Sequence, residues 1–113
     1  MFKKSSNVIT GVYVIRDEVA GVFGIPIILE SDGLARRQFI DYLAQDSVYG
    51  HRDEFTLHHV ADYCSASATY YPLKEKDRIT LSYSDVKDAV ERLRSEAGAA
   101  VGVQPPQAAC SDL

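Results

Sequence analysis

The chain has 113 residues, a length that allows one domain of ordinary size. Hydrophobic residues make up 46% of it and charged residues 25%, both close to the averages for soluble globular proteins. Twelve Lys and Arg residues against sixteen Asp and Glu residues leave a formal net charge of −4. That charge disfavours a protein that binds nucleic acid by electrostatics alone.

The cysteine content and the absence of long apolar runs indicate the compartment. Cys64 and Cys110 are far apart in the sequence, unlike the dense cysteines of a secreted disulfide scaffold. No stretch reaches the roughly 18 consecutive apolar residues of a membrane span. Two lysines near the start are followed by Thr10, Gly11 and Arg16 instead of the clean apolar region of a signal peptide. We therefore expect a cytosolic protein with no membrane segment.

The first elements are expected to form a β-hairpin. Residues 8–15 are rich in Val, Ile and Tyr and carry apolar residues on both alternating sets, which predicts a strand covered on both faces. A polar turn follows over residues 16–21, with Gly21 available for a positive φ angle. Residues 22–29 form a second β-prone run, and Pro26 within it predicts an edge strand or an interruption.

A helix is predicted after this hairpin. Ser31 and Asp32 offer oxygen atoms that can cap its N-terminus, and the helix is expected to end around Asp46 or Ser47. A loop should follow over residues 48–53. The apolar residues that repeat at helical spacing are Ala35, Phe39, Tyr42 and Leu43.

The next segments again favour strands. Residues 54–63 alternate and predict a strand that carries five side chains on one face: Phe55, Leu57, His59, Ala61 and Tyr63. Residues 64–68 suit a turn, and residues 69–73 are β-prone, with Pro72 indicating an edge or a strand end. An alternating charge run over residues 74–78 precedes a short apolar segment, 79–81.

A second helix should close the domain. Ser82 and Asp85 fit a capping box, with Ser84 as an alternative cap, and Gly98 fits a C-cap. Its expected core-facing residues are Val86, Ala89, Val90, Leu93 and Ala97. The order β-β-α-β-β-α predicts an α+β fold, with two helices packed against one mainly antiparallel sheet. We expect a flexible N-terminus over residues 1–7, a single domain over 8–98 and a disordered tail over 99–113.

The sequence offers little for catalysis or metal binding. The only metal-like grouping is His51, His58, His59 and Cys64, and adjacent histidines on a strand point to opposite faces. No motif supports a nucleophilic cysteine, and no glycine-rich phosphate-binding loop is present. We therefore expect no enzymatic activity, no metal and no cofactor.

Aromatic residues beside cations are more informative. Tyr70 and Tyr71 precede Lys74, Lys76 and Arg78, and such mixtures bind single-stranded nucleic acid by stacking bases on rings and pairing phosphates with cations. The alternative is that one tyrosine packs in the core and the charge run is a solvated hairpin tip. The anions interleaved in the charge run weaken its field and favour that alternative when these residues are taken alone.

Three segments together resemble a known phage family. They are residues 13–17 with residues 20–23 and Pro26; then Asp32 with Ala35-Arg36-Arg37-Gln38-Phe39; then residues 51–60, His51-Arg52-Asp53-Glu54-Phe55-Thr56-Leu57-His58-His59-Val60. In this order and spacing they resemble the small nonstructural protein of gokushovirus-like microviruses, an early protein often called DNA-binding. The resemblance covers about residues 12–63, and Arg52 stands where the family has proline.

The resemblance implies a non-enzymatic role in making or packaging a circular single-stranded genome. Such a protein would act with the replication-initiator protein or the procapsid in the host cytoplasm. The residues expected to contact single-stranded DNA are Arg36, Arg37, Tyr70, Tyr71, Lys74, Lys76 and Arg78. The alternative is a protein-binding adaptor, or a homodimer joined through an edge strand near Pro26 or Pro72, that does not touch DNA.

Overall fold

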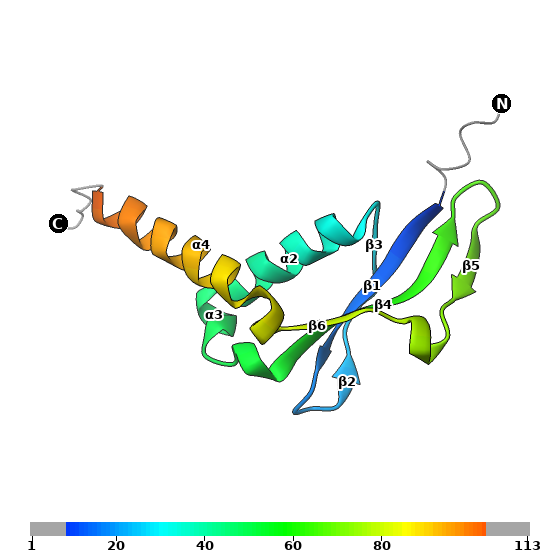
Figure 1. The fold of residues 1–113 in the computed structure, drawn as a ribbon, viewed down its shortest axis with the longest axis horizontal. Coiled ribbons are helices and arrows are strands. Elements are labelled where there is room, and N and C mark those ends of the chain that lie inside the picture. Colours follow the sequence, from blue (N-terminus) through cyan, green and yellow to red (C-terminus); the bar gives the residue numbers. More distant parts are fainter. Residues whose placement is uncertain (1–8, 104–113) are drawn as a thin grey trace.

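The computed structural model describes residues 9–103 of the chain, and the side chains of residues 9–97 (Figure 1). The strands are β1 (Ile9–Asp17), β2 (Val22–Phe23), β3 (Ile27–Leu29), β4 (Phe55–Cys64), β5 (Thr69–Pro72) and β6 (Thr80–Ser82). The α-helices are α2 (Asp32–Ala44), α3 (Asp46–Tyr49) and α4 (Tyr83–Val103), with 3-10 turns η1 (Arg52–Glu54) and η2 (Glu75–Asp77). The predicted α+β class is confirmed.

The six strands form one antiparallel sheet with two long central strands. β1 and β4 pair along their whole lengths, β2 and β3 both pair with β1, and β5 and β6 both pair with β4. Because β4 occupies one side of β1, β2 and β3 must share the other side as one interrupted edge strand. β5 and β6 form the second interrupted edge in the same way. The predicted antiparallel sheet is therefore confirmed, with each outer strand split in two.

Proline explains both interruptions. Pro26 and Pro72 lack the N–H that continues a ladder of hydrogen bonds, so each outer strand breaks at its proline. The chain leaves the first edge at Gly24-Ile25-Pro26 and the second over residues 73–79. The short apolar segment 79–81, which had no strand assigned to it, contributes most of β6.

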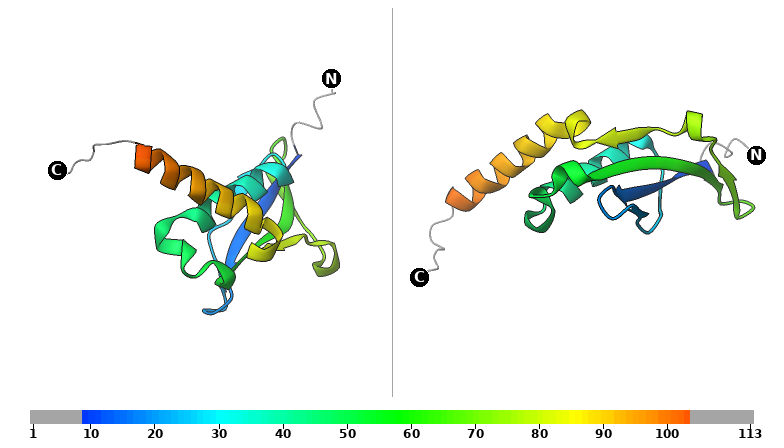
Figure 2. Two further views of the ribbon diagram at one scale, coloured as in Figure 1. Left: turned by 60° about the vertical axis from the view of Figure 1, so that its left-hand side comes forward. Right: turned by 90° about the horizontal axis from the view of Figure 1, so that it is seen from below.

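The two long helices pack against the same face of the sheet. α2 lies beside β3 and across β1 and β4, and α4 packs along α2 before extending past the end of the sheet (Figures 1 and 2). Ser31 caps α2 as predicted, because its Oγ accepts a hydrogen bond from the N–H of Leu34 at 3.2 Å. The largest fully buried side chains of this core are Phe39, Leu43, Val86 and Val90.

A β-bulge changes the face that the second half of β4 presents. The pairing shifts between Val12↔Ala61 and Tyr13↔His59, so Val60 is an extra residue in β4. Leu57 therefore faces the helices whereas Ala61 faces away from them. The prediction that five alternating residues of this strand share one face is wrong, because the extra residue inverts the alternation.

Two helix boundaries also differ from expectation. The stretch predicted as a loop, residues 48–53, contains the end of α3 and most of η1. The backbone N–H of Ser82 donates to Asp85 Oδ2 at 2.8 Å, which confirms the capping box with Ser82 as the cap. However, α4 continues through Gly98 to Val103, so the predicted C-cap at Gly98 is wrong. The predicted N-terminal segment 1–7 and the part of the tail beyond Val103 lie outside the described residues.

The described chain contains no helix with the length and apolar character needed to cross a membrane. α4 has 21 residues, but charged side chains recur along it.

Candidate nucleic-acid interface

The sheet has one face that α2 and α4 do not cover, here called the open face. Paired residues in antiparallel strands point to the same side, and Tyr13 and Leu57 point to the helices. Their neighbours therefore point away from the helices. The open face comprises Val12, Val14, Arg16, Phe23, Ile28, Thr56, His58, Ala61, Tyr63 and Tyr70, together with Thr10, Pro72, Thr80 and Ser82.

Two tyrosines lie at the hairpin end of the open face. Tyr63 of β4 and Tyr70 of β5 are directly opposite each other, and their ring centroids are 4.8 Å apart at an interplanar angle of 44°. Tyr70 remains 57% exposed. The ring of Tyr70 is therefore held by its neighbour while one side of it stays available for a flat ligand.

A second aromatic group lies at the other end of the open face. The Arg16 guanidinium sits 4.7 Å from the centroid of the Phe23 ring, and the His58 ring meets Phe23 edge-on at 5.4 Å. Arg16 pairs with Phe23 and Thr10 pairs with Tyr63, so the two aromatic groups are separated by six residues along β1, or about 20 Å. Phe23 was not among the predicted binding residues, because its position opposite Arg16 depends on the strand register.

His58 lies between these groups and is held in its neutral form. Thr56 Oγ1 donates to Glu18 Oε2 at 2.5 Å and accepts from His58 Nε2 at 2.8 Å, while the hydroxyl of Thr80 lies 3.3 Å from His58 Nδ1. This arrangement fits the neutral tautomer with a proton on Nε2. Burial of the imidazole lowers the pKa of His58 below its usual value, and the nearby Glu18 carboxylate only partly offsets this effect.

Glu18 limits the positive charge at this end of the open face. Its carboxylate accepts a hydrogen bond from Arg16 Nε at 3.1 Å, and the Thr56 hydroxyl together with Arg16 lowers the pKa of Glu18. Arg16 is therefore already paired with an anion. The Phe23 end offers an aromatic surface with little net charge.

Five of the predicted binding residues lie on one edge of the sheet. Tyr70 belongs to the open face, whereas Tyr71 pairs with Asp62 and points to the opposite side. Lys74 and Lys76 are exposed in the loop that joins β5 to β6. Arg78 is exposed in the same loop, where its Nε donates to the carbonyl of Leu73 at 3.2 Å.

The two predicted arginines of α2 lie elsewhere. Arg36 and Arg37 are exposed on a helix that packs on the other side of the sheet from Tyr70. Arg37 borders a hollow beside Ile27 and Leu29 of β3. Tyr70 and the lysine loop thus lie on the same edge of the sheet, whereas the helix arginines lie on the other side of the sheet from the open face.

His59 occupies the helix side of the sheet and is engaged by carboxylates. Its ring stacks on Tyr13 at 4.7 Å, and its Nε2 lies 3.0 Å from Asp62 Oδ1. The Tyr13 hydroxyl donates to Asp32, and burial followed by this hydrogen bond raises the pKa of Tyr13. Within residues 9–103, no group of three or more His, Cys, Asp or Glu residues is placed to hold a metal ion.

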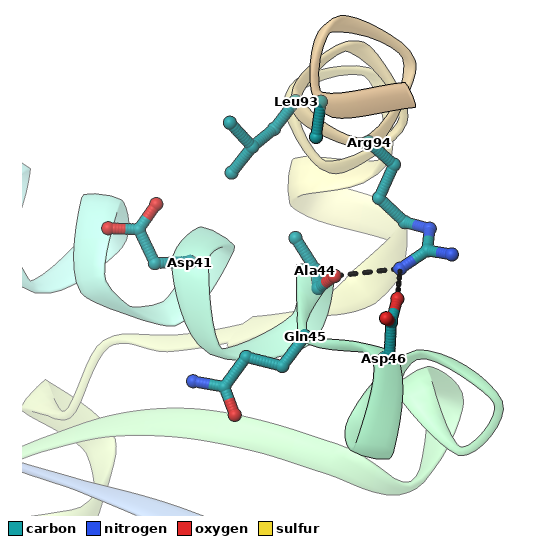
Figure 3. A pocket seen from close by; sticks show the side chains of 7 residues that line it. Asp41, Ala44, Gln45, Asp46, Leu93 and Arg94 are labelled. Carbon is teal, nitrogen blue, oxygen red and sulfur yellow. Dashed lines mark hydrogen bonds and ion pairs between the residues drawn. The ribbon is translucent and has the colours of Figure 1, made fainter. Parts of the chain in front are cut away.

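A separate pocket of about 480 Å³ lies between the C-terminal end of α2 and α4 (Figure 3). Arg94 crosses one side of it and donates to the carbonyl of Ala44 at 2.8 Å and to Asp46 at 3.1 Å. Leu93 supplies an apolar wall. The guanidinium of Arg94 is already engaged by these two hydrogen bonds. The pocket is therefore part of the junction between α2 and α4 and offers no distinct chemistry.

The fold defines a small α+β protein with one open sheet face that carries aromatic rings at both ends. Over residues 10–88, from β1 into α4, the chain matches the model of the phage ORF5 protein family. The chain therefore belongs to the phage ORF5 protein family and is a phage protein. No curated protein and no solved structure matches it significantly.

Proposed function

We propose that this protein is a non-enzymatic phage nonstructural protein that binds single-stranded DNA across its open face. One observation carries the proposal: the exposed ring of Tyr70, supported by Tyr63, lies on the same sheet edge as Lys74 and Lys76. An aromatic ring next to cations is the combination that binds unpaired bases and their phosphates without sequence preference.

The geometry of the open face supports a path for several nucleotides. Tyr70 and Phe23 stand about 20 Å apart along the strands, with the small residue Ala61 between them. Base stacking is tolerant of sequence because every base has a flat π face. The net charge of −4 and the pairing of Arg16 with Glu18 imply that stacking contributes more of the affinity than phosphate contacts.

The similarity to gokushovirus-like microviruses extends the proposal to the phage life cycle. We infer that the protein acts in the host cytoplasm during synthesis and packaging of a circular single-stranded genome. Its partners there would be the replication-initiator protein or the procapsid.

The neighbouring tyrosines of β5 provide a matched test. Binding of a short fluorescent single strand is measured by anisotropy for Tyr70→Ala and Tyr71→Ala. Loss of one stacked base costs about 1–3 kcal/mol, so Tyr70→Ala should weaken binding roughly 5- to 150-fold. Tyr71→Ala should leave the affinity unchanged, because Tyr71 lies on the other side of the same strand. No binding at low salt, or equal losses in both variants, would contradict the proposal.

A second candidate is an adaptor that binds protein and not DNA. The observation that favours it is the row of exposed apolar side chains along β2 and β3. The same titration separates the two candidates, because an adaptor shows no affinity for the single strand at low salt.

A further inference from the structure

Apolar side chains gather along the edge of the sheet formed by β2 and β3. Val19 is 74% exposed and Ile25 is 86% exposed. Single exposed apolar residues scattered over a surface are normal, but these belong to one stretch of the chain. The exposed apolar residues of this stretch are Val19, Val22, Phe23, Ile25, Ile28 and Leu34. Val22 and Ile25 line one hollow beside this edge, and Leu34 lines the adjoining one. Exposed apolar side chains that gather in this way mark an interaction site.

The two edges of the sheet differ in how they are protected. The β5–β6 edge is interrupted by a loop that carries Lys74, Lys76 and Arg78, and exposed charges of this kind prevent strands of other molecules from pairing. The β3 segment, Ile27–Leu29, carries no charge. Within residues 9–103 no strand pairs with its outer side. β3 therefore presents backbone donors and acceptors together with apolar side chains.

A groove runs beside this edge on the helix side. Two adjoining hollows of about 420 and 460 Å³ share Ile15, Ile27 and Tyr42 in their walls. Arg37 and Asp41 of α2, four residues apart, border the second hollow. Asp17 borders the first hollow. The edge is thus apolar at its centre and carries one cation and two anions on its helix side.

We propose that a second copy of this chain occupies the β3 edge, with the two β3 strands paired antiparallel about a two-fold axis at Ile28. In this register Ile28 faces its own symmetry mate, and Ile27 faces Leu29 of the second copy. Paired residues of antiparallel strands share a face, so the exposed Ile28 side chains meet on the open face while the other two meet on the helix side.

Self-complementarity favours a second copy over an unrelated partner. A two-fold axis gives each β3 an identical apolar strand, so both edges are satisfied by the same contact. Arg37 and Asp41 both border the hollow beside β3, so each copy brings a cation and an anion to the contact and opposite charges can pair across the two-fold axis.

The dimer is formed through the β3 edge and does not depend on DNA binding. The two-fold axis runs perpendicular to the sheet, so both open faces lie on the same side of the dimer.

Sedimentation equilibrium of the full chain, without DNA, tests the proposal over a range of concentrations. We expect a monomer–dimer equilibrium that Ile28→Lys weakens roughly tenfold or more, because like charges then meet at the axis. Ile79→Lys is the matched control: Ile79 is 49% exposed and Ile28 is 43% exposed, but Ile79 lies on the opposite edge. A chain that stays monomeric throughout, or a dimer weakened equally by both variants, overturns the proposal.

Disulfide cross-linking tests the register without destabilising the edge. Directly opposite residues of antiparallel strands have Cα atoms about 4.5–5.5 Å apart, within the range of about 4.4–6.8 Å that a disulfide spans. In a chain carrying Cys64→Ser and Cys110→Ser, Ile28→Cys should form a covalent dimer on mild oxidation. Ile79→Cys should remain monomeric on a non-reducing gel. Equal cross-linking of the two variants contradicts the assigned register.

Discussion

His58 lies on the open face between the hydroxyls of Thr56 and Thr80, and its environment favours the neutral imidazole. Because burial lowers the pKa of His58 in the folded chain, the unfolded chain binds its proton more readily. The contribution of His58 to stability is therefore fully present above the unfolded pKa of about 6.5 and is lost as the pH falls below it.

We expect His58→Gln to reduce the fall in the free energy of unfolding as the pH drops below about 6.5. Urea denaturation at a series of pH values measures this effect. The lowered pKa values of Glu18 and Glu91 act in a different window, because their stabilisation is lost only below about 4.5. A profile that stays parallel to wild type in His58→Gln would contradict this assignment.

Single residues were predictable where local chemistry decides their role. Ser31 caps α2 through its side-chain oxygen, and Ser82 caps α4 through its backbone N–H, which donates to Asp85. Gly21 takes the positive φ angle of its turn. The partner of Phe23 could not be predicted in this way. The contact of Phe23 with Arg16 depends on the register of the hairpin, which cannot be derived from the sequence.

At the scale of elements, one cluster of polar side chains attaches α4 to the rest of the fold. The hydroxyls of Tyr49 and Tyr83 both donate to the Glu91 carboxylate, and these hydrogen bonds lower the pKa of Glu91. Arg52 lies between the two tyrosine rings, with its guanidinium 4.2 Å from the centroid of Tyr49 and 5.0 Å from that of Tyr83. The cluster joins α3, η1 and the start of α4.

Removal of one hydroxyl from this cluster should lower stability without altering the fold. We expect Tyr83→Phe to reduce the free energy of unfolding by about 1 kcal/mol, because a buried ring keeps its packing but the carboxylate loses a donor. Tyr71→Phe, on the exposed side of β5, should change it by less than about 0.5 kcal/mol. Equal stability of the two variants in urea denaturation would show that the cluster does not hold α4.

The elements themselves were predicted better than their details. Pro26 and Pro72 correctly indicated interrupted or edge strands, since the missing N–H acts locally. The bulge at Val60 was not predictable, because it depends on the pairing of β4 with β1. Gly98 does not end α4, since one glycine costs a helix only about 1 kcal/mol and helix-forming alanines surround it.

At the scale of the whole molecule, the candidate binding residues are divided between two sides of the sheet. The composition shows only that these residues belong to a chain with a net charge of −4, and not where they lie on the molecule. The structure separates Arg36 and Arg37, on α2, from the exposed lysines of the β5–β6 loop. This separation arises from the packing of α2 on the sheet, so no local sequence pattern could have indicated it.

Because the two arginines and the two lysines lie on different sides of the sheet, a salt titration can measure the contribution of each pair to DNA binding. The logarithm of affinity for a single strand falls with the logarithm of salt concentration by about 0.7 for each phosphate neutralised. We expect Lys74→Ala combined with Lys76→Ala to make this slope shallower by about 1.4, because both lysines are exposed in the loop that follows the strand of Tyr70. Arg36→Ala combined with Arg37→Ala removes the same charge from the other side of the sheet and should leave the slope unchanged. If the arginine pair changes the slope and the lysine pair does not, DNA follows α2 and the open face is not the binding surface.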